Sequence, residues 1–120
     1  MHGLIGERIL MRIYLGEADK HEGAHTYDAI LKLLRERHLA GATVFRGSMS
    51  FGANAVIHTD RLELMSLDLP IVIECVETEE NLKRVLPDLD GMIGSGLITL
   101  ERANVITYRA EESAPTGAAR

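Results

Sequence analysis

The chain has 120 residues, of which 46% are hydrophobic and 26% are charged, the balance of a soluble globular protein. Its formal net charge is −5 at pH 7, so the basic footprint of nucleic-acid binding is missing and we expect no nucleic acid as a partner. No apolar run approaches the roughly 20 residues that span a bilayer, and the single cysteine cannot form an internal disulfide. We therefore expect one cytoplasmic domain without membrane insertion.

The first part of the chain predicts a strand, a helix and a second strand. Residues 8–15 form a short aliphatic segment bounded by a glycine, which is typical of a strand. A polar connection follows at 16–23. From 25 to 39 apolar residues recur at helical spacing, which predicts a helix with Gly41 as its stop. The residues of this face are Tyr27, Ile30, Leu31, Leu34 and His38. The second strand is predicted at 42–49.

A long excursion, residues 46–69, separates the second strand from the third, which is predicted at 71–77. Within it, residues 62–67 alternate weakly and could extend a strand. Small domains with so long a loop between core strands usually use it for function.

The second half predicts a helix and a final strand. Thr78 is the expected N-cap, and two glutamates follow it in the first turn. The inner face of this helix is expected to consist of Leu82, Val85, Leu86, Leu89 and Ile93. Pro87 should bend or divide the helix, because proline removes a backbone hydrogen bond. A glycine-rich turn at 94–96 ends it, a last strand is predicted at 97–109, and residues 110–120 are expected to be a flexible tail.

The order strand, helix, strand, strand, helix, strand is that of a split βαβ unit. It predicts an α+β, ferredoxin-like fold (βαββαβ) with an antiparallel sheet and two helices on one face. The other sheet face is also expected to be apolar in places, through Met11, Ile13, Val44 and Ile73. A monomer could leave such a face in water only at a cost, so we expect an oligomer that buries it.

Five blocks of sequence, taken in order, resemble a known family. They are RIYLGEADKHEG (12–23), GATVFRGSMSFGAN (41–54), IHTDRL (57–62), DLPIVIECVET (68–78) and GLITLERANVITY (96–108). They resemble the PII-like proteins grouped as domain of unknown function 190, also called uncharacterised protein family 0166, over nearly everything from Gly6 to Tyr108. Several blocks in order are far more specific than one short motif. The resemblance implies a single PII-like domain over residues 1–109.

Through that family the chain is more distantly similar to the PII signalling proteins. These are ferredoxin-like trimers that bind adenine nucleotides in clefts between subunits and engage channels, transporters or enzymes through a long loop. The resemblance implies a homotrimeric regulatory protein that contacts a target through the loop 46–69. Arg46, His58 and Arg61 of this loop either keep it soluble or offer charge and hydrogen bonds to a partner surface or an anionic ligand, two interpretations of equal weight. The resemblance also implies a cofactor-binding set, with an adenine nucleotide as the candidate. This set is Gly41, Ala42, Thr43, Phe51, Gly52, Gly94, Gly96 and Arg109.

The sequence departs from the PII pattern at three of the matching positions. Ser50 stands where PII proteins have the first glycine of a Gly-Phe-Gly motif. Leu97 replaces a phosphate-facing lysine, and Thr107 replaces one arginine of a pair whose other member is Arg109. Because charge-assisted contacts are the strong ones for phosphate, we do not expect tight triphosphate binding, whereas a monophosphate or a nucleoside-like ligand remains compatible.

Two further functions are compatible with this resemblance. A divalent-metal-binding trimer, similar to the cation-tolerance proteins, would use His21 and His25, although a solvated polar loop is the favoured interpretation of that segment. The other function is that of a ligand-free accessory of an ion channel. Fluoride channels are one example, because family members are sometimes encoded beside them. We expect no enzyme and no catalytic residues, because no serine lies in a triad-like order and Glu74 and Glu77 are expected to face solvent or a neighbouring subunit.

Overall fold

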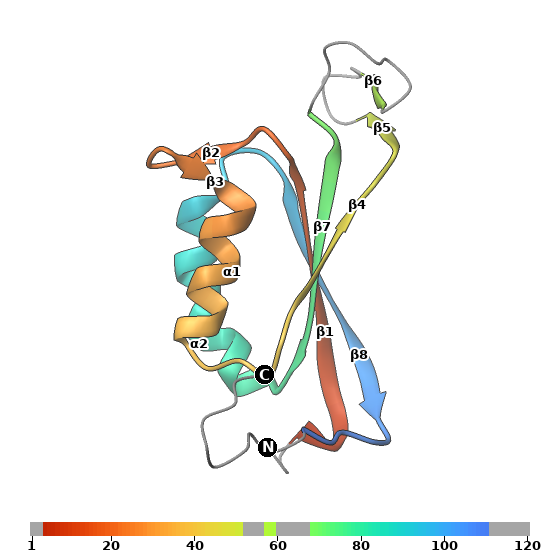
Figure 1. The fold of residues 1–120 in the computed structure, drawn as a ribbon. Coiled ribbons are helices and arrows are strands. Elements are labelled where there is room, and N and C mark those ends of the chain that lie inside the picture. Colours follow the sequence, from red (N-terminus) through yellow and green to blue (C-terminus); the bar gives the residue numbers. More distant parts are fainter. Residues whose placement is uncertain (1–3, 52–56, 60–67, 111–120) are drawn as a thin grey trace, which may run out of the picture.

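The computed structural model describes residues 4–51, 57–59 and 68–110, and its core is one four-stranded antiparallel sheet with both helices on one face (Figure 1). The strands are β1 (Gly6–Gly16), β4 (Thr43–Arg46), β7 (Pro70–Glu77) and β8 (Leu97–Val105), and the helices are α1 (Thr26–Glu36) and α2 (Glu79–Met92). The strand order β4-β7-β1-β8 makes β1 and β7 central and leaves β4 and β8 as the edges. The predicted α+β, ferredoxin-like fold is confirmed.

Two small strand pairs extend from this core. Strands β2 (Lys20–His21) and β3 (Ala24–His25) form a short hairpin before α1. Strands β5 (Met49–Phe51) and β6 (Ile57–Thr59) pair within the long loop. The predicted strand extension at residues 62–67 lies outside the described residues.

The core lies between the sheet and the two helices. Alternate residues of the central strands are buried there, among them Met11, Ile13 and Ile73. Both helices close this layer with aliphatic side chains, and each fully buried one contributes roughly 1.5–3 kcal/mol. The buried helix residues of the core are Ile30, Leu34, Leu82, Val85 and Leu89.

The prediction that Met11, Ile13, Val44 and Ile73 lie on the other sheet face is wrong. Ile13 pairs with Ile73, and Ile73 with Val44, so these three residues share one face, and it is the face that the helices cover. The reason is the two-residue period of a strand, because a shift of one position moves every side chain to the opposite face. In β1 the alternation itself separates Arg8, Arg12 and Tyr14 from Met11 and Ile13, so the error concerns only which of the two faces the helices cover.

The open face does carry an apolar row, made of different residues. Phe45, Val72, Tyr14 and Leu97 are register partners across β4, β7, β1 and β8. Phe45 and Leu97, at the two edges, remain 50% and 53% exposed. This row crosses the whole width of the sheet, and it is the apolar surface that a second copy could cover.

Helix α1 ends earlier than predicted, in a Schellman motif. The His38 N–H donates to the Arg35 carbonyl at 3.0 Å, and the Leu39 N–H donates to the Leu34 carbonyl at 3.1 Å. His38 has a left-handed backbone with φ of 61°. The predicted helix end at Leu39, with Gly41 as the stop, is therefore wrong, because a histidine occupies the position that glycine usually takes.

Replacing His38 with glycine is expected to stabilise the protein by about 1 kcal/mol, because glycine adopts φ > 0 without the steric cost that histidine pays. The free energy of unfolding from urea titrations measures the gain. Lys32→Gly, inside α1, is the matched control and should lose about 1 kcal/mol. A His38→Gly protein less stable than the parent would contradict the assignment of left-handed strain to this residue.

Helix α2 follows its prediction at the start and departs from it in the middle. The Thr78 hydroxyl accepts a hydrogen bond from the Asn81 N–H at 3.2 Å, which confirms the N-cap. Pro87 lies inside a helix that continues to Met92, so the helix is not divided there. Buried Val85 and Leu89 on either side of this exposed proline hold both parts of the helix against the sheet.

Two strands are shorter than predicted because their partners end. Strand β8 stops at Val105 and not at Arg109 as predicted. Val105 pairs with Gly6, the first residue of β1, so among the described residues no partner lies beyond it. Strand β4 stops at Arg46 and not at residue 49. Beyond it, the Gly47 N–H still donates to the Pro70 carbonyl at 2.8 Å, but proline has no N–H to donate in return, and the ladder ends.

Within the described part of the chain, neither helix has the length and apolar character needed to cross a membrane.

Candidate functional site

A hollow of about 380 Å³ lies where the chain enters β4, before that strand is fully paired with β7. Gly41, Ala42 and Thr43 line it, and Thr43 makes the first register pair of β4, with Glu74. Tyr108, from the segment that follows β8, lines it too. We name this hollow the strand pocket. Three residues of the sequence-derived cofactor set thus share one concave site, whereas Tyr108 was not predicted as a member of that set.

Glu77 supports one wall of the strand pocket from the inside of the protein. It is only 4% exposed, which contradicts the expectation that it faces solvent or a neighbouring subunit. Its carboxylate accepts hydrogen bonds from the Ala40 N–H at 2.7 Å, the Thr78 N–H at 3.1 Å and the Asn81 side-chain amide at 2.8 Å. These three donors satisfy the hydrogen-bonding needs of the buried carboxylate. Through them, Glu77 ties the start of α2 to Ala40, the residue before Gly41.

The glycine-rich turn of the cofactor set lies at the other edge of the sheet. Gly94 and Gly96 precede β8, whereas Thr43 belongs to β4, and these two strands are opposite edges. Three strand spacings separate the edges, which is about 14 Å. In a single copy the two groups of residues therefore do not line one pocket.

The other described residues of the set are not part of the lining of the strand pocket. Phe51 lies in β5 and is exposed, and Arg109 is exposed and directly follows Tyr108, a residue of that lining. Gly52 and Arg61 lie outside the described residues. His58 belongs to β6, where only its backbone is described.

Arg46, expected to contact a target, is engaged within the chain at the base of the long loop. It forms an ion pair with Glu17, a residue of the connection after β1. The same connection holds the other end of the loop, because the Glu17 N–H donates to the Leu69 carbonyl and the Ala18 N–H to the Asp68 carboxylate. Both ends of the loop are thus tied to residues 17 and 18.

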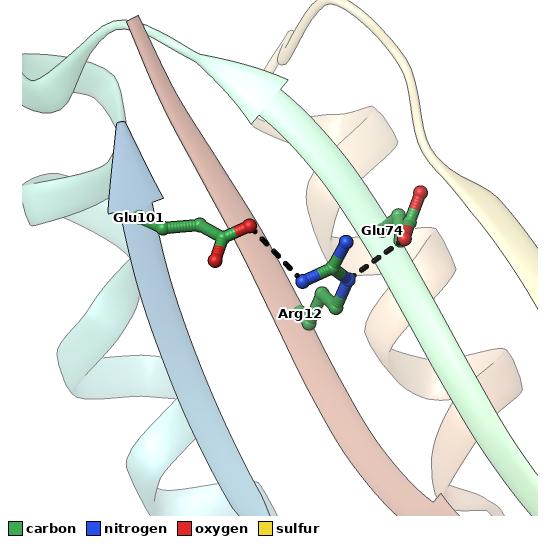
Figure 2. Close-up of polar contacts among 3 residues, drawn as sticks. All are labelled: Arg12, Glu74 and Glu101. Atoms are coloured by element: carbon green, nitrogen blue, oxygen red, sulfur yellow. Dashed lines mark hydrogen bonds and ion pairs between the residues drawn. The ribbon is translucent and has the colours of Figure 1, made fainter. Parts of the chain in front are cut away.

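The centre of the open sheet face carries a three-residue charge network (Figure 2). Arg12 donates to Glu74 at 2.8 Å and to Glu101 at 3.1 Å, and so bridges β7 and β8 across β1. The hydrogen bond to Glu74 raises the pKa of Arg12 above its ordinary value. Because Glu74 lies on the open face and Glu77 on the helix-covered face, the two cannot act as an acid-base pair.

The two candidate metal ligands do not share a helical face. His21 lies in β2, and His25 is the residue before α1, paired with Lys20. The Nδ1 atom of His25 lies 3.1 Å from the Glu17 carbonyl oxygen, and the His25 ring stacks on the Tyr27 ring. Across residues 4–51, 57–59 and 68–110, no three histidine, cysteine or acidic residues are grouped so that they could hold a metal ion.

Cys75 lies behind the strand pocket in the core, and burial, assisted by the charge of Glu77, raises the pKa of its thiol to about 12. We expect the folded protein to react very slowly with a disulfide reagent at pH 8, because the thiolate is the reactive species and forms only near pH 12. Absorbance assays of thiol release, with and without denaturant, measure this difference. Equal rates in both conditions would contradict the buried placement.

Comparison with known proteins identifies relatives over almost the whole described chain. The model of the family DUF190, described as Uncharacterized ACR, matches residues 8–105. A UPF0166 protein of Methanocaldococcus jannaschii is 42% identical over 103 residues, which cover 85% of this chain and 93% of that protein. A UPF0166 protein of Aquifex aeolicus is 39% identical over 97 residues, covering 81% and 91%.

The fold is also similar to that of solved structures. The PII-like nitrogen regulatory protein CPII from Thiomonas intermedia K12, solved bound to ADP, AMP and bicarbonate, superposes with a TM-score of 0.64 at 18% identity, covering 81% of this chain and 86% of that one. A second structure of CPII, bound to ADP and bicarbonate, gives a TM-score of 0.60 at 19% identity, with coverage of 81% and 86%. At this identity the likeness establishes a shared fold.

Proposed function

The chain belongs to the DUF190 (UPF0166) family, and we propose that it is a PII-like regulatory protein that binds an adenine nucleotide between copies of itself. Ligand binding would change the order of the loop 46–69, which would then bind or release a target protein. The observation that carries this proposal is the position of the cofactor set on opposite edges of one sheet.

That position favours a site completed by a second copy. If the β4 edge of one copy faces the β8 edge of the next, the residues of the set at the β4 edge of the first and those before β8 of the second border one interface. Contacts between two different edges are head-to-tail, and they close into a ring when the rotation between neighbouring copies allows it. The similarity to PII proteins, which are trimers, favours a ring of three copies. The apolar row ending in Phe45 and Leu97 supplies further surface for such an assembly.

The polar groups at the site favour a base or nucleoside part over a triphosphate. The strand pocket is lined by Gly41, Ala42, Thr43 and Tyr108, and also by Glu74, whose carboxylate is paired with Arg12. Leu97 opens β8, beside the glycine turn, and is half exposed with no charge to offer. Arg109 is the cation that remains for a phosphate. ADP and AMP, bound by the fold relative CPII, are therefore the first ligands to test.

Isothermal titration calorimetry with ATP, ADP, AMP and GDP tests the proposal. We expect ADP or AMP to bind, ATP to bind no more tightly than ADP, and GDP to give no heat. Gly41→Trp should abolish binding, because the open space beside Gly41 would be filled by the indole ring. If no adenine nucleotide binds at millimolar concentration, the adenine-nucleotide function is wrong for this protein.

A further inference from the structure

A second hollow, which we name the helix pocket, lies between α1 and the connection that leads into β4. Its volume is about 580 Å³, within the range of small-molecule sites. The connection contributes residues 39–42. The α1 residues that line it are Asp28, Leu31, Lys32, Leu34 and Arg35.

The lining combines aliphatic with charged side chains. Leu31 and Leu39 are half-buried and Leu34 is buried, and we name these three aliphatic side chains the apolar floor of the pocket. Lys32 and Arg35 are three positions apart on the helix and therefore lie next to each other on its surface. Asp28 lies one turn before Lys32, so the lining carries one net positive charge in a chain whose net charge is −5.

The two cations are available to a ligand. Among the residues that the structure describes, neither Lys32 nor Arg35 forms an ion pair or a side-chain hydrogen bond. Arg37, at the same end of α1, differs because Asp88 of α2 pairs with it. Two unpaired cations beside an apolar floor can hold an anionic group while the floor takes an apolar body.

We propose that the helix pocket binds a small organic acid with an aliphatic or aromatic body. The carboxylate lies between Lys32 and Arg35, and the body packs on Leu31 and Leu39. A charge-assisted hydrogen bond contributes enough to change affinity about tenfold, and burial of the body adds to it. The helix pocket and the strand pocket, at which the nucleotide is proposed to bind, are two hollows with some lining residues in common.

The helix pocket and the strand pocket share a wall. Ala40, Gly41 and Ala42 line both, and the hydrogen bond from the Ala40 N–H to Glu77 fixes the start of that wall. A ligand on one side therefore contacts the backbone that the other ligand uses, which would couple the two affinities. The coupling rests on the proposed nucleotide function, whereas acid binding in the helix pocket does not.

A titration with octanoate, followed by backbone amide shifts and without any nucleotide, tests the proposal. We expect saturable shifts centred on Leu39, Ala40 and Gly41. Octylamine, which has the same chain and the opposite charge, should bind at least about tenfold more weakly. The double variant Lys32→Glu/Arg35→Glu should lose octanoate affinity by about tenfold or more, while Lys83→Glu, an exposed lysine of α2, should keep it.

Three results would overturn the inference. They are equal octanoate affinity in the double variant and the parent, equal binding of octylamine and octanoate, and shifts confined to the open sheet face. Both substituted side chains are exposed, so the double variant should fold, and its circular dichroism spectrum checks this. Because the sample holds no nucleotide, failure of the nucleotide proposal leaves this result unaffected.

Discussion

Glu77→Ala is expected to lower the free energy of unfolding by about 3 kcal/mol. The substitution removes a carboxylate that accepts from two backbone N–H groups and one side-chain amide. Each buried donor left without an acceptor costs about 1–3 kcal/mol. Denaturant titration of the purified variant measures the loss.

The same substitution is expected to weaken ligand binding at the strand pocket, because it releases Ala40, which precedes Gly41. Glu80→Ala is the matched control. Glu80 is an exposed glutamate in the first turn of α2 and should contribute less than about 1 kcal/mol through the helix dipole. Equal stability losses in the two variants would show that burial of Glu77 has no energetic consequence.

Gly96→Ala is expected to destabilise the protein by about 3 kcal/mol or more. A Cβ at this position would lie 2.3 Å from the Tyr14 backbone carbonyl oxygen, and φ is +151°. Neither backbone can move without disturbing the pairing of β1 with β8. Thermal unfolding followed by circular dichroism should show a lower midpoint for the variant.

Gly94→Ala tests whether the effect is local to Gly96. Gly94 lies two residues earlier in the same turn, and a Cβ there would meet nothing within 4 Å. We expect its unfolding midpoint to stay close to that of the parent protein. A similar drop in both variants would indicate a general need for glycine in this turn and not the close approach to Tyr14.

Periodicity and connection order were sufficient to predict the fold but not the buried face of each strand. The apolar run at residues 71–77 forms a central strand, and the helical spacing of Leu82, Val85 and Leu89 corresponds to buried positions. In β1, Arg8 and Arg12 share one face and Met11 and Ile13 share the other. The side on which the helices pack is a property of the whole fold, and local sequence does not contain it.

The candidate site was partly accessible from the sequence for a similar reason. Gly41, Ala42 and Thr43 are neighbours in the chain and stay together in the strand pocket. Tyr108 is far from Gly41 in the sequence, because strands β4, β7 and β8 and helix α2 lie between them. The fold alone brings it to that pocket. Glu77 sits in a strand-like segment beside Glu74, and no sequence signal distinguishes the buried carboxylate from the exposed one.

The central claim, that the ligand site is completed by two copies of the chain, is tested most directly by mixing two defective variants. Gly41→Trp fills the strand pocket, and Gly94→Glu places a negative charge in the turn before β8. Both positions have open space for a side chain. Each variant alone should fail to bind ADP in calorimetry.

Refolding an equal mixture of the two variants should restore binding in about one quarter of the sites. An intact site needs the pocket of a Gly94→Glu copy beside the turn of a Gly41→Trp copy, and random assembly gives this combination at about one interface in four. ADP binding at that fraction, with the affinity of the parent protein, is the result that a shared site predicts. No recovery in a mixture that has assembled into mixed oligomers would contradict a site shared between copies.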